Sequence, residues 1–271
     1  MSHERDYVLG THDEEVDRLG LQHRVWRPRA SAAWRKAGFT VGQTLLDLGC
    51  GPGYASVDLA EIVGPEGRII AIDRSRRFLD VLEATRRQRG LDQITTLELD
   101  LDLANLPEAG ADGAWSRWVF SFVKHPRALL ERVAGSLKPR GVLAMHEYFA
   151  YATWEILPKA TEFEEFVRVV MDTWRDEGGE ADIGLDLPIW LGELGFEIRS
   201  LESIIEIVRP TDFVWQWPKA FVEVGLKRLV DLGRMTQQRA TEILTAFQSR
   251  EASPHALMIT PAVLEIIAVL R

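Results

Sequence analysis

A glycine-rich turn after an apolar segment constrains this chain more than any other feature. Residues 45–53 read Leu-Leu-Asp-Leu-Gly-Cys-Gly-Pro-Gly, and twenty positions after Gly53 the apolar segment 68–72 ends at Asp73. In a parallel α/β sheet, such a turn lets the backbone approach a ligand closely, and the acid accepts hydrogen bonds from ribose hydroxyls. The pattern therefore predicts an α/β fold that holds a nucleoside.

The glycine spacing also indicates which kind of nucleoside. Gly49-x-Gly51-x-Gly53 is not the Gly-x-Gly-x-x-Gly spacing of dinucleotide turns, because Tyr54 stands where that spacing continues. Pro52 removes one N–H donor that a phosphate would use. The turn therefore suits a ligand without phosphates. An ordinary strand-to-helix turn is the alternative, but the acid and both flanking apolar segments agree better with a ligand site.

The segments around the turn alternate between strand and helix patterns. Strands are expected at 44–48, 68–72, 94–99, 113–119 and 141–148, and helices at 54–63, 76–89 and from Pro126 to about Leu137. This alternation predicts a parallel sheet with both faces covered. Right-handed crossovers then place the ligands along the edge formed by the carboxyl ends of the strands.

The two ends of the chain have a different pattern. Residues 12–37 predict one or two helices, broken near Pro28, and residues 150–177 are helical and rich in aromatic residues. Further segments predict helices at 186–194, 219–231 and 236–250, and late strands at 196–208 and 262–270. If the segment around them is extended, Trp215 and Trp217 point the same way. We expect an N-terminal helical lid (1–40), a core (41–150) and a helical cap with the last strands (151–271), all in one structural domain.

Composition excludes several functions. The net charge of −9 disfavours nucleic acid held through its phosphates. No apolar run is long enough to span a bilayer, and the charged residues at 1–6 do not resemble a signal peptide. The single cysteine, Cys50, cannot form an internal disulfide, so we expect a cytoplasmic protein. We also expect a monomer or homodimer, with no metal site.

Four motifs together resemble one family, the class I S-adenosylmethionine-dependent methyltransferases of the small-molecule type. The segment 47–53, Asp-Leu-Gly-Cys-Gly-Pro-Gly, is similar to the family's first motif, and Asp73 stands where the family has its ribose-binding acid. The segment 102–107, Asp-Leu-Ala-Asn-Leu-Pro, resembles the adenine-binding motif after the third strand, and 137–141 resembles the turn before the fifth, with Arg140 in place of a glycine.

The resemblance implies a Rossmann-like, seven-stranded, mostly parallel sheet with helices on both faces, preceded by N-terminal helices and followed by a helical cap. It implies S-adenosyl-L-methionine as cofactor and S-adenosyl-L-homocysteine as product. The cofactor-binding residues that it suggests are Asp47, Gly49, Gly51, Gly53, Asp73, Arg74, Asp102, Leu103, Ser116 and, from the N-terminal segment, Tyr7 and Gln22.

Methyl transfer from a sulfonium requires mainly that the nucleophile be aligned and water excluded, with a base where the nucleophile carries a proton. His146, at the end of a strand, is a candidate base or a structural histidine. Glu147 matches an acid often found in the family after the fifth strand, and it acts in catalysis or supports the sheet edge. Arg117, inside an apolar strand, needs a carboxylate partner from the substrate or from Glu147.

The aromatic residues near these positions suggest the acceptor. Trp118, Tyr148, Tyr151 and Trp154 line a flat pocket or form part of the core. We therefore expect methyl transfer to a small, planar or aromatic acceptor, such as a secondary metabolite. The alternatives are a protein or RNA methyltransferase, and a nicotinamide-dependent dehydrogenase built on the same sheet.

Overall fold

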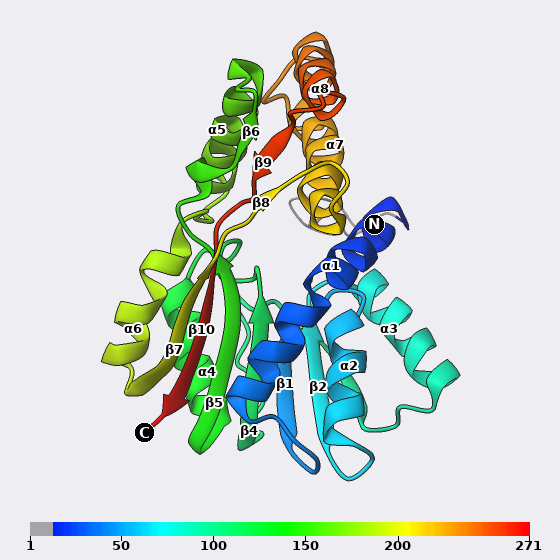
Figure 1. Ribbon diagram of the computed structural model, residues 1–271. Coiled ribbons are helices and arrows are strands. Elements are labelled where there is room, and N and C mark those ends of the chain that lie inside the picture. The colour runs from blue at the N-terminus through cyan, green and yellow to red at the C-terminus, as the bar shows by residue number, and fades with distance from the viewer. Residues whose placement is uncertain (1–12) are drawn as a thin grey trace.

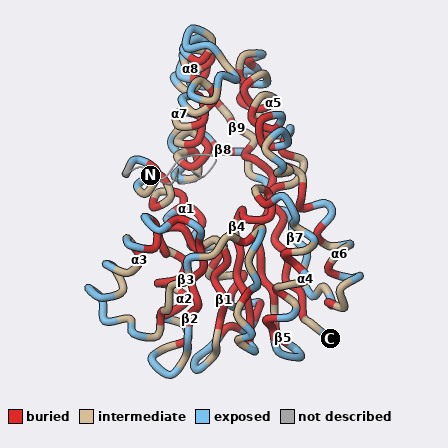
Figure 2. The backbone as a smooth tube through the Cα atoms, turned by 180° about the vertical axis from the view of Figure 1, so that it is seen from behind, coloured by how far each residue is buried: buried red, intermediate tan, exposed pale blue. Residues whose placement is uncertain are grey.

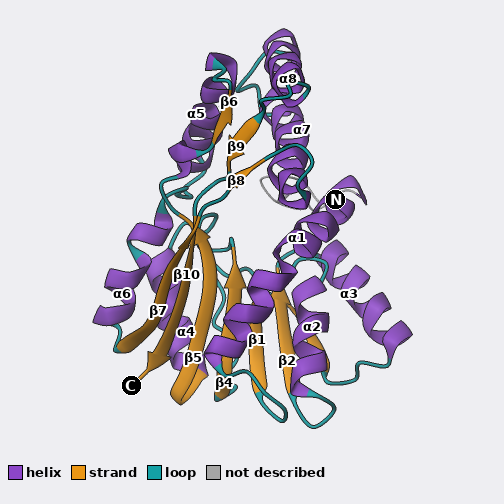
Figure 3. Ribbon diagram, viewed as in Figure 1, coloured by secondary structure: helices purple, strands orange, loops and turns teal. Residues whose placement is uncertain are grey.

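The centre of the molecule is a seven-stranded sheet, in a computed structural model that describes residues 13–271 (Figures 1 and 3). Its strand order is β3-β2-β1-β4-β5-β10-β7, and β10 runs antiparallel to both of its neighbours. The strands are β1 (Thr44–Leu48), β2 (Arg68–Asp73), β3 (Ile94–Glu98), β4 (Ala111–Arg117), β5 (Leu137–Tyr148), β7 (Phe196–Ile204) and β10 (Val263–Leu270). The predicted mostly parallel, Rossmann-like sheet is confirmed. The antiparallel strand distinguishes it from the parallel sheet of dinucleotide-binding folds.

Five helices cover the two faces of the sheet, which makes three layers. On one face lie α1 (Asp13–Ala37), α2 (Tyr54–Val63) and α3 (Arg76–Arg89), and on the other lie α4 (Pro126–Ser136) and α6 (Leu187–Glu193). Alternate strand residues serve the two faces: Leu45 packs with the α1–α2–α3 layer, whereas Leu46 packs with the α4–α6 layer. Figure 2 shows the strands buried between the two layers.

A cap rises above the carboxyl ends of the parallel strands. It consists of helices α5 (Thr161–Asp176), α7 (Gln216–Asp231) and α8 (Gln237–Glu251), two short 3-10 helices (Tyr151–Thr153 and Phe213–Trp215) and a small antiparallel sheet of β6 (Glu155–Leu157), β9 (Leu257–Ile259) and β8 (Ile207–Val208). A third 3-10 helix (Ile183–Leu185) packs with the α4–α6 layer instead. Two separate insertions supply the cap, one after β5 and one after β7. Pairing of β6 with β9 joins the insertions, so the cap packs as one aromatic-rich cluster.

Some local expectations were wrong. Helix α1 continues through Pro28 without a break in its helical assignment. The strand expected at 196–208 is divided into β7, in the central sheet, and β8, in the cap. Residues 150–177 are not wholly helical, because β6 lies among them. The two strand details depend on pairing between segments that are distant in the sequence, which the local sequence pattern does not predict.

The two tryptophans at the start of α7 do not share a side. Trp215 belongs to a 3-10 turn and its indole Nε1 donates to Glu251 at 2.7 Å, whereas Trp217 is helical and packs on Trp26 and Trp118. The extended conformation on which the shared direction depended is absent from this segment. Among residues 13–271, no helix has the length and apolar character needed to cross a membrane.

Candidate active site

Two adjoining chambers open at the carboxyl ends of the parallel strands. The first encloses about 810 Å³ and the second about 470 Å³, both volumes including the openings to solvent. Gly49 and Phe122 line both chambers, so the two meet beside the glycine turn. The pair is therefore suited to an elongated ligand that passes along this turn.

The glycine turn has a conformation that needs glycine. Gly49 adopts a φ of +62°, and a Cβ atom built on it would lie 2.4 Å from Val119 Cγ2. Gly53 adopts a φ of +83° at the start of α2, and a Cβ atom built on it would lie 2.3 Å from Leu82 Cδ1 of α3; unlike Gly51, it lines neither chamber. The amide of Gly51 donates to Asp73 Oδ2 at 2.8 Å. The turn and the predicted acid are thus joined directly.

Acidic residues line the second chamber. Asp73 Oδ1 accepts a bond from the amide of Ser75 at 2.8 Å, and burial raises the pKa of Asp73. Arg74 and Asp102, two of the predicted cofactor-binding residues, also line this chamber. Asp102 Oδ1 accepts hydrogen bonds from the amides of residues 124 and 125, so it also fixes the loop before α4. The side chain of Leu103 is 73% exposed and is not among the lining residues.

Asp100 is a lining acid that the sequence argument missed. It lies in the second chamber, and its Oδ1 accepts from the amide of Asp102 at 2.9 Å. The segment contains two acids separated by one leucine, and the motif by itself selected only the second. The available signal was the pair of acids itself, which follows shortly after the end of a strand, where ligands bind in such sheets.

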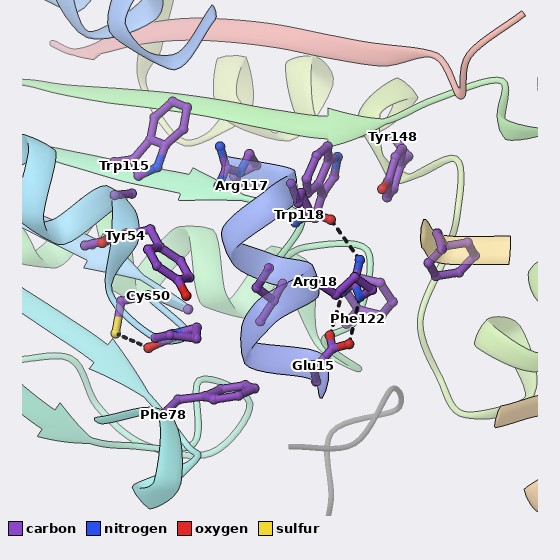
Figure 4. A pocket seen from close by; sticks show the side chains of 18 of the residues that line it. Glu15, Arg18, Cys50, Tyr54, Phe78, Trp115, Arg117, Trp118, Phe122 and Tyr148 are labelled. Carbon is purple, nitrogen blue, oxygen red and sulfur yellow. Dashed lines mark hydrogen bonds and ion pairs between the residues drawn. The ribbon is translucent and has the colours of Figure 1, made fainter. Parts of the chain in front are cut away.

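Helix α1 roofs the first chamber (Figure 4). Arg18 donates to both carboxylate oxygens of Glu15, at 2.6 and 2.7 Å, and to the amide oxygen of Gln22 at 3.0 Å. All three side chains are buried, and Leu19 lies beside them in the chamber wall. Gln22 was predicted here. Tyr7, the other predicted N-terminal residue, lies outside the described residues.

Two charged residues, Asp47 and Arg117, line the sheet side of this chamber and differ in their hydrogen-bond partners. Asp47 Oδ2 accepts from Ser56 Oγ at 2.5 Å, and burial raises its pKa to about 7. Arg117, at the end of β4, has Nη2 3.4 Å from His23 Nδ1, and desolvation lowers its pKa to about 10. Ser116 is fully buried behind Arg117 and lines neither chamber in the described structure.

An aromatic wall faces the cap. Trp118 stacks on Tyr148 at 5.1 Å between ring centroids and on Trp217 at 5.4 Å. Trp118 itself has a φ of +54°, an unusual value for a bulky residue. The residues that complete the aromatic lining are Trp115, Phe122, Trp174 and Phe221, together with Phe78 and Tyr54 near the glycine turn (Figure 4).

Two predicted pocket residues lie behind this wall. Tyr151 packs edge-on against Tyr148, and Trp154 packs against Tyr151 and donates from Nε1 to Met258 Sδ at 3.3 Å. Both belong to the core of the cap. Trp174 and Phe221 line the chamber in their place, and the sequence held no signal for this choice.

The two predicted catalytic residues are buried beneath the chambers. His146 is fully buried, lines neither chamber in the described structure, and lies 3.0 Å through Nε2 from Glu265 Oε2. Glu147 accepts hydrogen bonds from the backbone amides of residues 119, 120 and 121 and from the Ser121 hydroxyl, at 2.8–3.2 Å. These contacts favour the structural interpretation of each residue over the catalytic one.

Relatives of known sequence cover the core of the chain. Residues 46–145 match the family described as "Methyltransferase domain". An uncharacterized 37.1 kDa protein in transposon Tn4556 of Streptomyces fradiae is 35% identical over 172 residues, 62% of this chain and 47% of that protein. A 2-phytyl-1,4-naphtoquinone methyltransferase of Synechococcus elongatus is 29% identical over 177 residues, 62% of this chain and 69% of that enzyme. The chain thus spans less than half the length of the Streptomyces protein.

A solved structure agrees with the fold over nearly the whole chain. A putative methyltransferase from Bacillus halodurans superposes with a TM-score of 0.58 at 16% identity, covering 89% of this chain and 97% of that one. The sheet order with its antiparallel β10, and the glycine turn joined to Asp73, lie in or beside the segment that matches the family. This chain therefore carries a class I S-adenosylmethionine-dependent methyltransferase domain.

Proposed function

We propose that this protein transfers the methyl group of S-adenosylmethionine to a small acceptor with a planar, aromatic ring system. The observation that carries this proposal is the first chamber, which has aromatic rings on its cap side and the glycine turn on the other. Flat rings pack favourably against aromatic side chains, edge to face or offset-stacked, and such side chains line much of this chamber. Because α1 roofs the chamber, the space suits a small molecule better than a folded macromolecule.

The residues present fit the cofactor. Gly49 lines both chambers where they meet, and Asp73 lines the second chamber with both oxygens already accepting amide hydrogen bonds. We assign the ribose to Asp73, the adenine to the region of Asp100 and Asp102, and the amino acid portion to the first chamber beneath Arg18. The second chamber is also lined by the apolar side chains of Leu99, Val119 and Val123, which suit the faces of a purine ring.

Bound there, S-adenosylmethionine supplies an activated methyl group, and the protein aligns the acceptor and excludes water. The chamber offers little for proton removal. Glu15 is paired with Arg18, and burial raises the pKa of Tyr148 far above its usual range, so its phenol stays protonated. Among the described residues that line the first chamber, Asp47 is the one carboxylic acid not paired with an arginine, and it accepts a hydrogen bond from Ser56. The arrangement therefore favours acceptors that do not depend on a strong protein base.

Similar proteins support the same acceptor class. The Synechococcus relative is named for a naphthoquinone, which is a planar ring system. A macromolecular acceptor would need an open approach to the methyl group, whereas the roof formed by α1 narrows that approach. The net charge of −9 also disfavours RNA.

The test has two stages. Calorimetry should first show binding of S-adenosylhomocysteine and none of NADH, with Asp73→Ala as the cofactor-deficient control. Mass spectrometry should then detect S-adenosylhomocysteine and a methylated product when S-adenosylmethionine is supplied with a panel of quinols, naphthols, indoles and aromatic amines. Methyl transfer to RNA or protein, with every member of the panel unmethylated, would contradict the proposed acceptor class.

A further inference from the structure

One cation in the first chamber lacks a carboxylate partner. Arg18 is neutralised by its bidentate contact with Glu15. Arg117 also lines the chamber, but no carboxylate oxygen lies within 4 Å of it among the described residues. Within residues 13–271, its Nη1 is buried and has no hydrogen-bond partner, and its Nη2 contacts only His23. The guanidinium also lies 5.3 Å from the Trp118 ring centroid.

The nearest acids do not neutralise this charge fully. Asp47 interacts with Arg117 only through space, accepts from Ser56, and has a pKa raised by burial to about 7, so it is only partly ionised near neutral pH. Asp58 is held by Arg27 and by His23. Arg117 itself keeps its proton, because even its lowered pKa of about 10 lies well above neutrality. A buried donor without a partner is unfavourable until a ligand supplies one.

We propose that Arg117 binds a carboxylate on the methyl acceptor, which makes the substrate a planar aromatic carboxylic acid. This inference rests on the proposed function. A guanidinium presents a planar pair of N–H donors that match a carboxylate, and Nη1 is free to take part in that contact. Trp118 follows Arg117 directly and begins the aromatic wall. One acceptor can therefore stack its ring on the wall and place its carboxylate at the end of β4.

The methionine portion of the cofactor carries a carboxylate too, and it is the other source of the same chemistry. The two sources differ in what they predict for S-adenosylhomocysteine. If Arg117 binds the acceptor, its loss leaves affinity for S-adenosylhomocysteine unchanged and removes discrimination between acids and amides. If it binds the cofactor, its loss weakens S-adenosylhomocysteine and leaves that discrimination as it was.

The experiment titrates the protein, saturated with S-adenosylhomocysteine, with 1-naphthoate and with the uncharged 1-naphthamide. The wild type should bind the acid at least tenfold more tightly than the amide. Arg117→Gln should bind both equally, and Arg117→Lys should keep part of the preference, because it keeps the charge and loses the planar fork. Arg35→Gln, which removes an exposed positive charge from α1 whose Nε donates to the Ser31 carbonyl, should behave as the wild type.

Several results would overturn the proposal. These are equal affinity of the wild type for acid and amide, no binding of 1-naphthoate at millimolar concentration, or a preference for the acid that survives in Arg117→Gln. A tenfold loss of S-adenosylhomocysteine affinity in Arg117→Gln would assign the residue to the cofactor. Melting curves establish whether each variant is folded. If Arg117→Gln does not fold, the acid-to-amide preference of Arg117→Lys tests the proposal in its place. Failure of the wild type to bind S-adenosylhomocysteine would instead refute the proposed function.

Discussion

His146 and Glu265 face each other on adjacent antiparallel strands, with Nε2 3.0 Å from Oε2. Lys36 of α1 donates to the other oxygen of Glu265 at 2.8 Å. The imidazole lies between the rings of Trp26 and Trp115, in the packing between α1 and the sheet. This chain of contacts, buried except at Lys36, ties α1 to β5 and β10, and it favours a structural role for His146.

We expect His146→Ala to lower the free energy of unfolding by about 2–4 kcal/mol, because it leaves a cavity and removes the partner of the buried Oε2 of Glu265. Turnover per folded molecule should stay within about twofold of the wild type. Urea titration and initial rates measure the two quantities. Glu265→Gln should share the stability loss, and the double variant should lose less than the sum of the two. A large fall in turnover at normal stability would restore His146 to the mechanism.

Asp73→Ala should weaken S-adenosylhomocysteine binding by about 1.5–3 kcal/mol, the range for hydrogen bonds to a charged group. The loss has a second source, because Asp73 also holds the amides of Gly51 and Ser75 in place. Calorimetry measures the affinity. Asp80→Ala, which removes an exposed acid from α3, is the matched control and should bind normally. An unchanged affinity for Asp73→Ala would refute the assignment of the ribose to this residue.

Gly49→Ala tests whether the passage between the chambers needs a glycine. The new Cβ would combine the strain of a positive φ, about 1–2 kcal/mol, with a 2.4 Å contact to Val119 Cγ2. Thermal unfolding should show lower stability, and calorimetry should show weaker S-adenosylhomocysteine binding.

Gly90→Ala separates the two effects, because Gly90 has a similar φ of +65° and nothing within 4 Å of the added atom. It should show the strain alone, with normal ligand affinity. Adding Val119→Ala to Gly49→Ala should recover part of the stability, since it removes the methyl group that clashes. Normal binding by Gly49→Ala alone would show that the turn is not a close-approach site.

The raised pKa of Asp47 predicts pH dependence of two kinds. Burial makes its folded-state pKa, about 7, higher than the unfolded value of about 3.9. The folded state then binds the proton more tightly, so this stability is fully present below about pH 4 and is lost as the pH rises from about 4 to about 7. The free energy of unfolding of the ligand-free protein should therefore fall between about pH 4 and pH 7, and this one group contributes a slope of at most about 1.4 kcal/mol per pH unit. Asp47→Asn should lack that component of the decline.

Cofactor binding should change in the opposite sense. A positively charged ligand favours the ionised carboxylate, so S-adenosylmethionine affinity should increase as the pH rises from 6 to 8. Titrations in buffers of different ionisation enthalpy should show proton release near pH 6.5, and Asp47→Asn should show less of it. An affinity that is independent of pH in the wild type would contradict the placement of Asp47 beside the bound cation.

Local sequence was sufficient for much of the fold. The apolar segments at 44–48 and 68–72, the capping residue Ser75 and the glycine turn are determined by neighbours in the chain, and the structure has strands, a helix start and a turn there. Asp73 meets Gly51 because two adjacent parallel strands in register place the end of one beside the turn of the other. Such relationships follow from the period of a strand and the direction of its crossover.

The acceptor side of the site could not be foreseen in the same way. Trp174 and Phe221 reach the chamber from two separate insertions, while Tyr151 and Trp154, nearer to β5 along the chain, are buried behind the wall. All four are aromatic residues of helical or irregular segments, and no periodicity distinguishes the lining pair from the buried pair.

What the sequence alone determined is the sheet, the glycine turn and the acid at the end of β2, because strand period, glycine conformation and crossover direction are local properties. What the tertiary structure decided is which side chains surround the acceptor. It buried His146 against Glu265, 119 residues further along the chain, and it left Arg117 without a carboxylate partner among the described residues. Packing between distant segments sets the partner of each buried charge, and chain order does not encode that packing in any short pattern.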